Sequence, residues 1–239
     1  MTTQEFSSSY DVLLDSYAQA ASFGEEGSRA SIQLNEYEKS VFLTEAQEEL
    51  VLSLYTGRNS SGNSFEETEE LRRCLSDLID EANLLPLSPG PGMPIGIDSK
   101  SKFFQLPPNL WYITYERLSI RNGKCDSHIE QEVVPVTQDE YNRLKKNPFR
   151  GTNYRRALRL DLSGNRVEIV SDYTIDTYYV RYLKRLSPII LAPLDTEKIR
   201  NESTVTECEL HESLHRKILD LAIENTLRSR GIGRQANKE

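Results

Sequence analysis

The segment His211–His215 is the part of the sequence whose residue types and spacing match a catalytic pattern. It reads His-Glu-Ser-Leu-His, which fits the H-E-x-x-H motif of zinc peptidases. In such a site both histidines bind zinc from one face of a helix, and the glutamate activates a water molecule. A zinc metallopeptidase is therefore one hypothesis for this chain.

The surrounding sequence does not complete a zinc site. A third ligand is needed, and Glu224 lies nine residues after His215, which on a helix is the opposite face and about 13 Å along the axis. Asp220 is also turned away, and Glu239 is the last residue of the sequence. Cys208 extends the pattern to Cys-x2-His-x3-His, but a fourth ligand is no easier to find. We therefore expect no metal or cofactor site.

Other arrangements of reactive side chains give no stronger hypothesis. The chain has three histidines, so His128 is the remaining candidate base, and no serine or cysteine lies in a nucleophile motif. We predict that the chain is not an enzyme and that His211 and His215 are exposed or cap a helix. A group of aromatic residues is predicted to form sheet core and cross-strand pairs rather than a ligand cage. The group consists of Trp111, Tyr112, Tyr115, Tyr178, Tyr179 and Tyr182.

Composition indicates a soluble protein with a substantial core. The 239 residues are 37% hydrophobic and 28% charged, which is too apolar for wholesale disorder. No apolar run is long enough to cross a bilayer, and no export signal begins the sequence, so no membrane partner is expected. The three cysteines are odd in number and lack metal-type spacing, which favours a reducing cytoplasm.

Charge is divided unevenly along the chain. Residues 1–100 carry 6 Lys/Arg against 18 Asp/Glu, residues 101–239 carry 23 against 19, and Tyr141–Leu186 alone carries 11 against 4. The charges either form solvated faces or let opposite ends of neighbouring copies attract, as in a head-to-tail ring. A nucleic-acid site is disfavoured, because no recognised binding motif is present and the net charge of −8 repels phosphate.

The helical pattern predicts an N-terminal helical hairpin. A short helix around Tyr10–Ala21, with residues 1–9 loosely held before it, precedes a break at Gly24–Arg29. The first hairpin helix begins at the capping-box pattern Thr44–Gln47 and ends at Gly57. The second begins at Ser64, with Glu67 three residues on, and has a stripe of residues predicted to be buried. That stripe consists of Leu71, Cys74, Leu75, Leu78 and Ile79.

From Phe103 the hydrophobic period changes to 2, which predicts a mostly antiparallel sheet of about five or six strands. Turn residues at Asn122-Gly123 and Gly164-Asn165 separate the predicted strands, and Thr137 caps a short inserted helix. A last helix is predicted at about Glu212–Ser229. The segments assigned to strands and to the inserted helix are Leu110–Arg121, Ser127–Val136, Gln138–Lys146, Arg155–Leu162, Arg166–Ser171, Thr174–Leu186 and, as a possible edge strand, Pro188–Leu191.

The predicted fold class is α+β, with an N-terminal helical hairpin, a central mostly antiparallel β-sheet and a C-terminal helix. The chain divides into five segments at changes of composition and periodicity, the clearest being a Pro/Gly-rich stretch. These segments are an N-terminal helix and loop (1–34), the helical hairpin (35–82), a Pro/Gly connector (83–101), the β region with its inserted helix (102–195), and the C-terminal helix and tail (196–239).

Two blocks of sequence carry a family resemblance. The N-terminal block consists of Asn35–Glu49 and Ser64–Arg73, and the C-terminal block consists of Arg181–Arg185, Pro188–Leu191 and Cys208–Leu219. Together they resemble structural virion proteins of crAss-like phages, a group whose members include the ring proteins stacked beneath the portal.

The resemblance implies a head–tail connector protein of the virion, assembled in the host cytoplasm. It implies a homo-oligomeric ring, of about twelve copies like the portal, that contacts the portal and other connector or tail proteins. The ring would extend the DNA channel, with genomic DNA passing through without specific binding, and the Pro/Gly connector would order on assembly. The alternative within the same group is an internal or other tail-associated virion protein.

Overall fold

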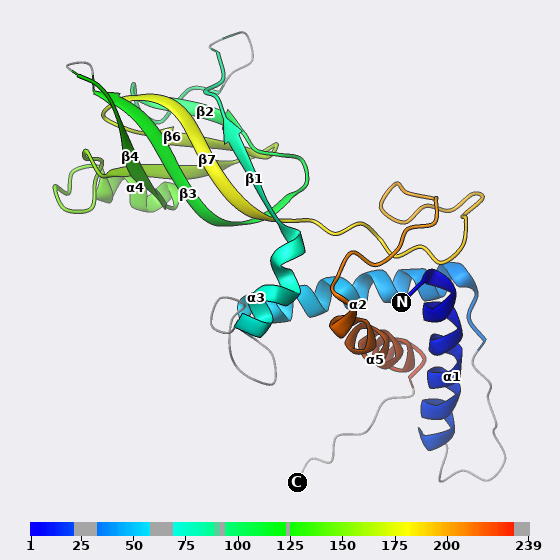
Figure 1. Ribbon diagram of the computed structural model, residues 1–239. Helices are drawn as coiled ribbons and strands as arrows, with labels where there is room; N and C mark the ends of the chain where they lie inside the picture. The colour runs from blue at the N-terminus through cyan, green and yellow to red at the C-terminus, as the bar shows by residue number, and fades with distance from the viewer. Residues whose placement is uncertain (22–32, 58–68, 89, 91–93, 123–124, 232–239) are drawn as a thin grey trace, which may run out of the picture. The chain divides into compact units, whose positions relative to one another are not determined.

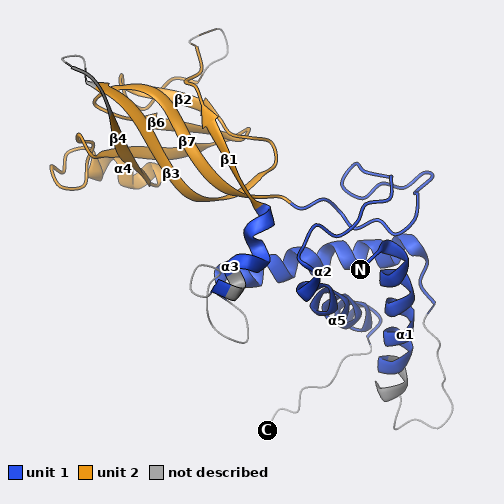
Figure 2. Ribbon diagram, in the orientation of Figure 1, with its two compact units in different colours: residues 1–78, 186–239 blue, residues 79–185 orange. Residues whose placement is uncertain are grey.

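The computed structural model describes residues 1–21, 33–57, 69–88, 90, 94–122 and 125–231 (Figure 1). The chain forms two compact units, one from residues 1–78 and 186–239 and the other from residues 79–185 (Figure 2). We call them the helical unit and the β unit. The α+β fold class is confirmed, because helices precede and follow a central sheet. The division into five sequence segments stays a prediction.

The helical unit is built from helices that come from both ends of the chain. The C-terminal helix α5 packs against α2 and against α1, as Figure 1 shows. The predicted bounds of α5 are confirmed, but its buried face differs from the predicted one of Leu214, Ile218, Leu221, Ala222 and Asn225. Leu221 and Asn225 are half-buried, whereas His215, Leu219, Ile223 and Thr226 are buried. The bounds of the helices are α1 Thr3–Ala21, α2 Glu36–Thr56, α3 Glu69–Leu75 and α5 Glu212–Ser229.

Helix α1 begins earlier than the sequence predicted. Residues 1–9 were expected to be loosely held, but Thr3 already starts the helix, so that expectation was wrong. Phe6, Tyr10 and Leu14 are buried at i, i+4, i+8, whereas Tyr17 is 44% exposed. The helix is therefore fixed by an apolar stripe that begins at Phe6, before the stripe of Tyr10, Leu13, Leu14 and Tyr17 that the sequence predicts. The predicted break at Gly24–Arg29 lies outside the described residues.

Helix α2 also begins earlier, and the predicted start at Thr44 was wrong. The side chain of Asn35 accepts a hydrogen bond from the backbone N–H of Glu38 (2.7 Å), and the Glu38 carboxylate accepts one from the N–H of Asn35 (3.0 Å). This reciprocal pair is the capping box of α2. Gly57 ends the helix with φ of 73°, a left-handed conformation that glycine adopts without strain; this predicted end is confirmed.

The segment after α2 changes from helix to strand before the predicted end at Ala82. The predicted start at Ser64 and Glu67 lies outside the described residues. The helix ends at Leu75, a 3-10 turn covers Ser76–Leu78, and strand β1 follows at Ile79–Leu84. Of the predicted buried stripe, Cys74, Leu75 and Leu78 are buried, but Ile79 is 38% exposed. The helix was therefore predicted too long.

The β unit contains a seven-stranded sheet in the order β1-β7-β3-β4-β5-β6-β2. Neighbouring strands are antiparallel except β4 and β5, which are parallel and joined by a crossover that contains α4. The mostly antiparallel sheet is confirmed, but β1 and β2 were not among the strands predicted from the sequence. Pro188–Leu191 does not join this sheet; Ile190 forms an isolated bridge with Thr206 in the helical unit. The remaining strands are β2 Ser101–Gln105, β3 Leu110–Asn122, β4 Cys125–Pro135, β5 Arg156–Leu162, β6 Arg166–Val170 and β7 Thr174–Lys184.

The sheet curls so that its two ends approach each other. Beyond the end of β1, Leu87 donates its backbone N–H to the carbonyl of Phe103 in β2 (2.8 Å). Inside the curl, the ring of Phe104 meets that of Tyr178 edge-on at 5.2 Å. The core of the β unit therefore lies on the concave face, and its buried members come from β2 to β7.

Helix α4 (Gln138–Leu144) covers part of the convex face. Thr137 caps it as predicted, by accepting from the N–H of Glu140. Tyr141 packs with Leu158, Leu160 and Val170 of β5 and β6. The tyrosine hydroxyl also donates to Asp98 (3.1 Å), which pairs with Lys145 (2.6 Å). These contacts fix the end of the predicted Pro/Gly connector to the β unit.

Candidate functional site

The two histidines of the H-E-x-x-H segment face different surroundings. His211 is the exposed N-cap of α5, and its Nδ1 accepts a hydrogen bond from the N–H of Ser213 (3.3 Å). This agrees with the expected capping role. His215 is 4% exposed, so the expectation of an exposed or capping residue was wrong for this histidine.

His215 is held inside the helical unit by groups on both sides of its ring. Its Nε2 lies 2.9 Å from the carbonyl oxygen of Leu210, its Nδ1 lies 2.9 Å from the amino group of Met1, and the ring of Phe6 lies 5.2 Å away. Burial lowers the pKa of His215 below its ordinary value of 6.5. A neutral ring with its proton on Nε2 satisfies both hydrogen bonds, so neither nitrogen is free for a metal.

The acidic residues considered as third ligands are engaged elsewhere. Asp220 pairs with Arg216 (3.3 Å), and Glu224 pairs with Arg228 (2.7 Å). Across the described part of the chain, no three His, Cys, Asp or Glu side chains are grouped as a metal site requires. Glu239 lies outside that part. The geometry therefore gives the zinc hypothesis no support.

Three polar side chains of α2 bind a distant segment of the chain, whereas the sequence predicted that Thr44 and Gln47 cap the helix. Ser40, Thr44 and Gln47 lie at i, i+4, i+7 and are all buried. The Thr44 hydroxyl accepts from the backbone N–H of Ile189 (3.1 Å), and Ser40 accepts from that of Leu191 (3.0 Å). Gln47 donates to the carbonyl of Ser187 (2.6 Å).

We call Ser40, Thr44 and Gln47 the α2 polar ladder. It satisfies backbone groups of the extended segment 187–191, which would otherwise be buried without partners. The ladder thereby joins the N-terminal and C-terminal parts of the chain into one unit. Both sequence blocks that carry the resemblance contribute to it.

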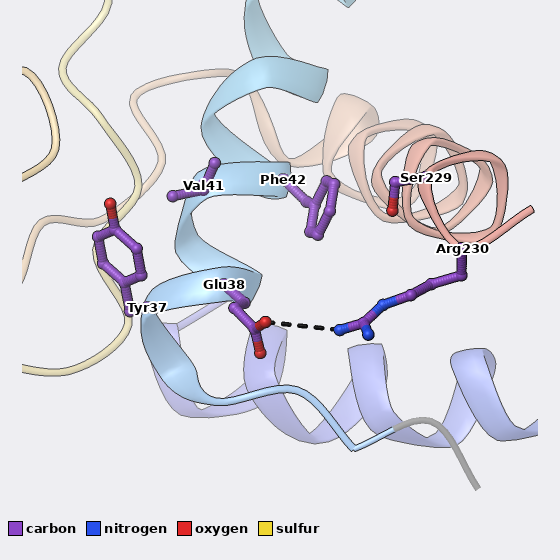
Figure 3. Close-up of a pocket in the computed structure, with 6 residues that line it drawn as sticks. All are labelled: Tyr37, Glu38, Val41, Phe42, Ser229 and Arg230. Atoms are coloured by element: carbon purple, nitrogen blue, oxygen red, sulfur yellow. Dashed lines mark hydrogen bonds and ion pairs between the residues drawn. The ribbon is translucent and has the colours of Figure 1, made fainter. Parts of the chain in front are cut away.

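A pocket of about 500 Å³ opens where the first turns of α2 meet the end of α5 (Figure 3). Across it, Arg230 Nη2 lies 3.5 Å from Glu38 Oε1. The lining combines one ion pair with apolar side chains, so it suits contact with an apolar group better than acid–base chemistry. The lining residues are Tyr37, Glu38, Val41, Phe42, Ser229 and Arg230.

The β unit encloses a charged pair in its core. Arg159 donates to Glu116 (2.8 Å), and the Tyr178 hydroxyl donates to the other carboxylate oxygen (2.5 Å). The two charged side chains are 10% and 9% exposed. Burial raises the pKa of Tyr178 well above its usual range, so the phenol keeps its proton. Arg159 Nε also lies 3.2 Å from the exposed carboxylate of Asp161. The cluster pairs its charges with one another and holds the concave face together rather than facing a substrate.

The tyrosines predicted as core and cross-strand pairs divide between two faces. Tyr178 and Tyr182 are buried in the core. Tyr115, 51% exposed, meets Tyr179 of the neighbouring strand with ring centres 6.2 Å apart. The guanidinium group of Arg117 lies 4.9 Å above the Tyr179 ring. Tyr115 and Tyr179 therefore form an exposed cross-strand pair on the outer surface, apart from the buried core tyrosines.

Within the described residues, none of the helices is long and apolar enough to span a membrane.

Comparison with known proteins gives matches along nearly the whole chain. The family described as "Phage tail ring protein 3/4" matches residues 1–238. Ring protein 3 of Bacteroides phage crAss001 is 42% identical over 228 residues, which cover 94% of each chain. Ring protein 4/5 of the same phage is 32% identical over 234 residues, which cover 94% of this chain and 91% of that protein.

Proposed function

Because the chain belongs to the phage tail ring protein 3/4 family, we propose that it forms a ring in the head–tail connector below the portal. The ring extends the DNA channel and joins the tail. The observation that carries this proposal is the family match over residues 1–238. Membership of this family makes the protein a structural ring component of the phage virion and not an enzyme.

The distribution of charge supports contacts between unlike surfaces of neighbouring copies. The helical unit carries 13 Lys/Arg against 24 Asp/Glu, a net charge of −11, whereas the β unit carries 16 against 13, a net charge of +3. A closed ring is built from heterologous contacts, in which each copy offers two different surfaces. Opposite net charges on two units favour such head-to-tail contacts over pairing of identical surfaces.

The proposed partners are other copies of this chain, the portal, and other connector or tail proteins. We take the copy number to be about twelve, because a ring stacked on a portal is simplest when both share one symmetry. Genomic DNA passes through the channel without specific binding, which a net charge of −8 per copy favours, since acidic walls do not hold phosphate. Assembly takes place in the host cytoplasm.

The full chain, purified alone and together with the portal protein, tests the proposal. Multi-angle light scattering gives the mass of the assembly, and negative-stain microscopy gives its shape. We expect a closed ring that co-migrates with the portal. A strict monomer in the presence of portal refutes the ring and favours an internal or other tail-associated virion protein.

A further inference from the structure

The loop between α4 and β5 concentrates positive charge on a pre-formed surface. The loop, residues 145–155, includes four Lys/Arg and no Asp or Glu. The loop also carries two of the large aromatic side chains most exposed in the described structure, Phe149 at 84% and Tyr154 at 52%. Exposed aromatic side chains beside arginines are typical of protein–protein contact surfaces.

The loop is held in shape by its own hydrogen bonds. The Asn147 side chain accepts from the backbone N–H groups of Phe149 (2.9 Å) and Arg150 (3.2 Å), and the Asn147 carbonyl accepts from Gly151 (2.7 Å). A Cβ atom at Gly151 would lie 2.8 Å from that carbonyl oxygen, so glycine permits the close turn. A loop that is already ordered loses little conformational entropy when a partner binds.

Three cations in this loop, Lys146, Arg150 and Arg155, have no acidic partner among the described residues. Lys145 is neutralised by Asp98 (2.6 Å), and Arg156 donates to the carbonyl of Phe149 (3.0 Å). Arg150 and Arg155 are exposed, and the Arg155 guanidinium group lies 5.0 Å from the centre of the Tyr154 ring. The loop thus presents two available guanidinium groups beside two aromatic rings.

Helix α2 of the helical unit has an exposed surface that carries acidic rather than basic side chains. The helix is covered by α5 on one side and bound through its polar ladder to residues 187–191 on another. Glu45, Glu49 and Leu52 remain exposed at i, i+4, i+7, with Leu52 at 40%. Glu49 lies at the border with α5, where one of its oxygens accepts a hydrogen bond from Asn225 (3.1 Å). We call these three residues the α2 stripe. It combines two carboxylates with an apolar side chain.

We propose that the α4–β5 loop of one copy docks on the α2 stripe of the next copy in the ring. Arg150 and Arg155 then face Glu45 and Glu49, and the loop aromatics cover Leu52. Charge complementarity argues for this partner, because the helical unit has a net charge of −11. Each copy carries one loop and one stripe, which is what a heterologous, ring-closing contact requires. The inference rests on the proposed ring.

DNA is the less suitable occupant of the loop. Phosphate binding would use the arginines but would leave Phe149 exposed to water, whereas an apolar protein stripe buries it. The net charge of −8 on each copy also opposes the approach of a duplex.

Reciprocal charge reversal tests the contact with the full chain, in the presence of portal. The loop variant carries Arg150→Glu and Arg155→Glu, and the stripe variant carries Glu45→Lys and Glu49→Lys. We expect each variant alone to lose the ring species in sedimentation velocity. An equimolar mixture should recover it, because in an alternating ring every loop meets a stripe of opposite charge.

A matched control carries Lys102→Glu and Arg185→Glu, two exposed cations of the β unit outside the loop. It changes the net charge as the loop variant does, and we expect it to keep the ring. Circular dichroism of each variant verifies folding. The stripe variant leaves the β unit unchanged and the loop variant leaves the helical unit unchanged, so recovery in the mixture cannot arise from repair of a misfolded chain.

The outcomes distinguish failure of the proposed loop–stripe contact from failure of ring formation. Failure of the mixture to recover the ring, or loss of the ring in the control, overturns the contact. A loop variant that still assembles but is no longer retained on immobilised duplex DNA also overturns it and assigns the loop to nucleic acid. If the wild-type chain forms no ring with portal, the proposed function is refuted and this contact with it.

Discussion

Substitution of Thr44 distinguishes two roles for this residue: a buried hydrogen-bond partner, as in the structure, and a helix N-cap, as its sequence pattern predicts. In the structure the Thr44 hydroxyl is buried and serves the backbone of Ile189, 145 positions away. If Thr44 were the N-cap of a helix, Thr44→Asp would be neutral or stabilising, because Asp is a better N-cap than Thr. In the polar ladder the same change places a carboxylate in a buried site, where the Thr44 hydroxyl lies 3.4 Å from the carbonyl oxygen of Ile189.

The size of the effect follows from which groups lose their partners. Thr44→Val keeps the shape of the side chain but leaves the N–H of Ile189 buried without an acceptor, which costs about 1–3 kcal/mol. Thr44→Asp costs several kcal/mol, because a buried charge is desolvated without a cation beside it. Thr44→Ser keeps the hydroxyl and loses one methyl group, about 0.8 kcal/mol.

Urea unfolding measures these changes with an internal control. Circular dichroism at 222 nm follows the helices, whereas fluorescence of Trp111, the single tryptophan, follows the β unit. A loss of about 2 kcal/mol lowers the midpoint by about 1 M for a typical dependence on urea. We expect Thr44→Val to shift the helical transition and to leave that of Trp111 in place. A Thr44→Asp variant as stable as the wild type refutes the ladder.

Three further predictions concern buried charge and the histidines. Burial lowers the pKa of His215, so the unfolded chain takes up a proton before the folded chain does as the pH falls through 6.5. The helical unit should therefore lose stability below that pH. His215→Gln should remove this part of the pH dependence in urea titrations. Arg159→Met should destabilise the β unit by about 3–5 kcal/mol, because it leaves Glu116 charged and buried; adding Glu116→Gln should recover part of the loss, and full additivity of the two changes would contradict the coupling. Mass spectrometry for metals should find no stoichiometric zinc in the purified chain; stoichiometric zinc that disappears in His211→Ala would revive the metallopeptidase hypothesis.

Elements whose determinants are local were predictable from the sequence. The bounds of α5, Glu212–Ser229, follow from its apolar spacing and its following glycine. The turn between β5 and β6 was predictable because Gly164 and Asn165 adopt positive φ of 73° and 56°, the conformation that these residue types tolerate best. The cap of α4 at Thr137 depends on a hydrogen bond three residues away. None of these features needs a distant partner.

Elements decided by distant partners were not predictable in this way. The pattern Thr44–Gln47 is that of a capping box, but both side chains serve residues 187–189. Likewise, Ile79–Leu84 continues the spacing of the preceding helix, and its pairing with β7 makes it a strand instead. In both cases the local pattern is compatible with two structures, and tertiary contacts select one.

The H-E-x-x-H segment also combines a local feature that the sequence predicted with packing by distant residues that it did not. The H-E-x-x-H spacing is correct for two ligands on one helix, but His215 is turned inward to Leu210 and Phe6. Which face of a helix is buried depends on what packs against it, and this packing comes from α1 at the other end of the chain. For the exposed loop around Phe149, the sequence indicated the positive charge but not the ordered conformation.

The two ends of the sequence that carry the resemblance are brought together by the α2 polar ladder and by the packing of α5 on α2. The β unit is inserted between them, and its first and last strands are antiparallel neighbours, with Ile79 opposite Leu183. The chain therefore enters and leaves the β unit at adjacent points, about 5 Å apart. Because these points are adjacent, the inserted β unit does not hold apart the two parts of the chain that the ladder joins. Buried contacts thus hold the helical unit together, while the α4–β5 loop and the α2 stripe are exposed; in the proposed ring these exposed features determine which neighbour each copy binds.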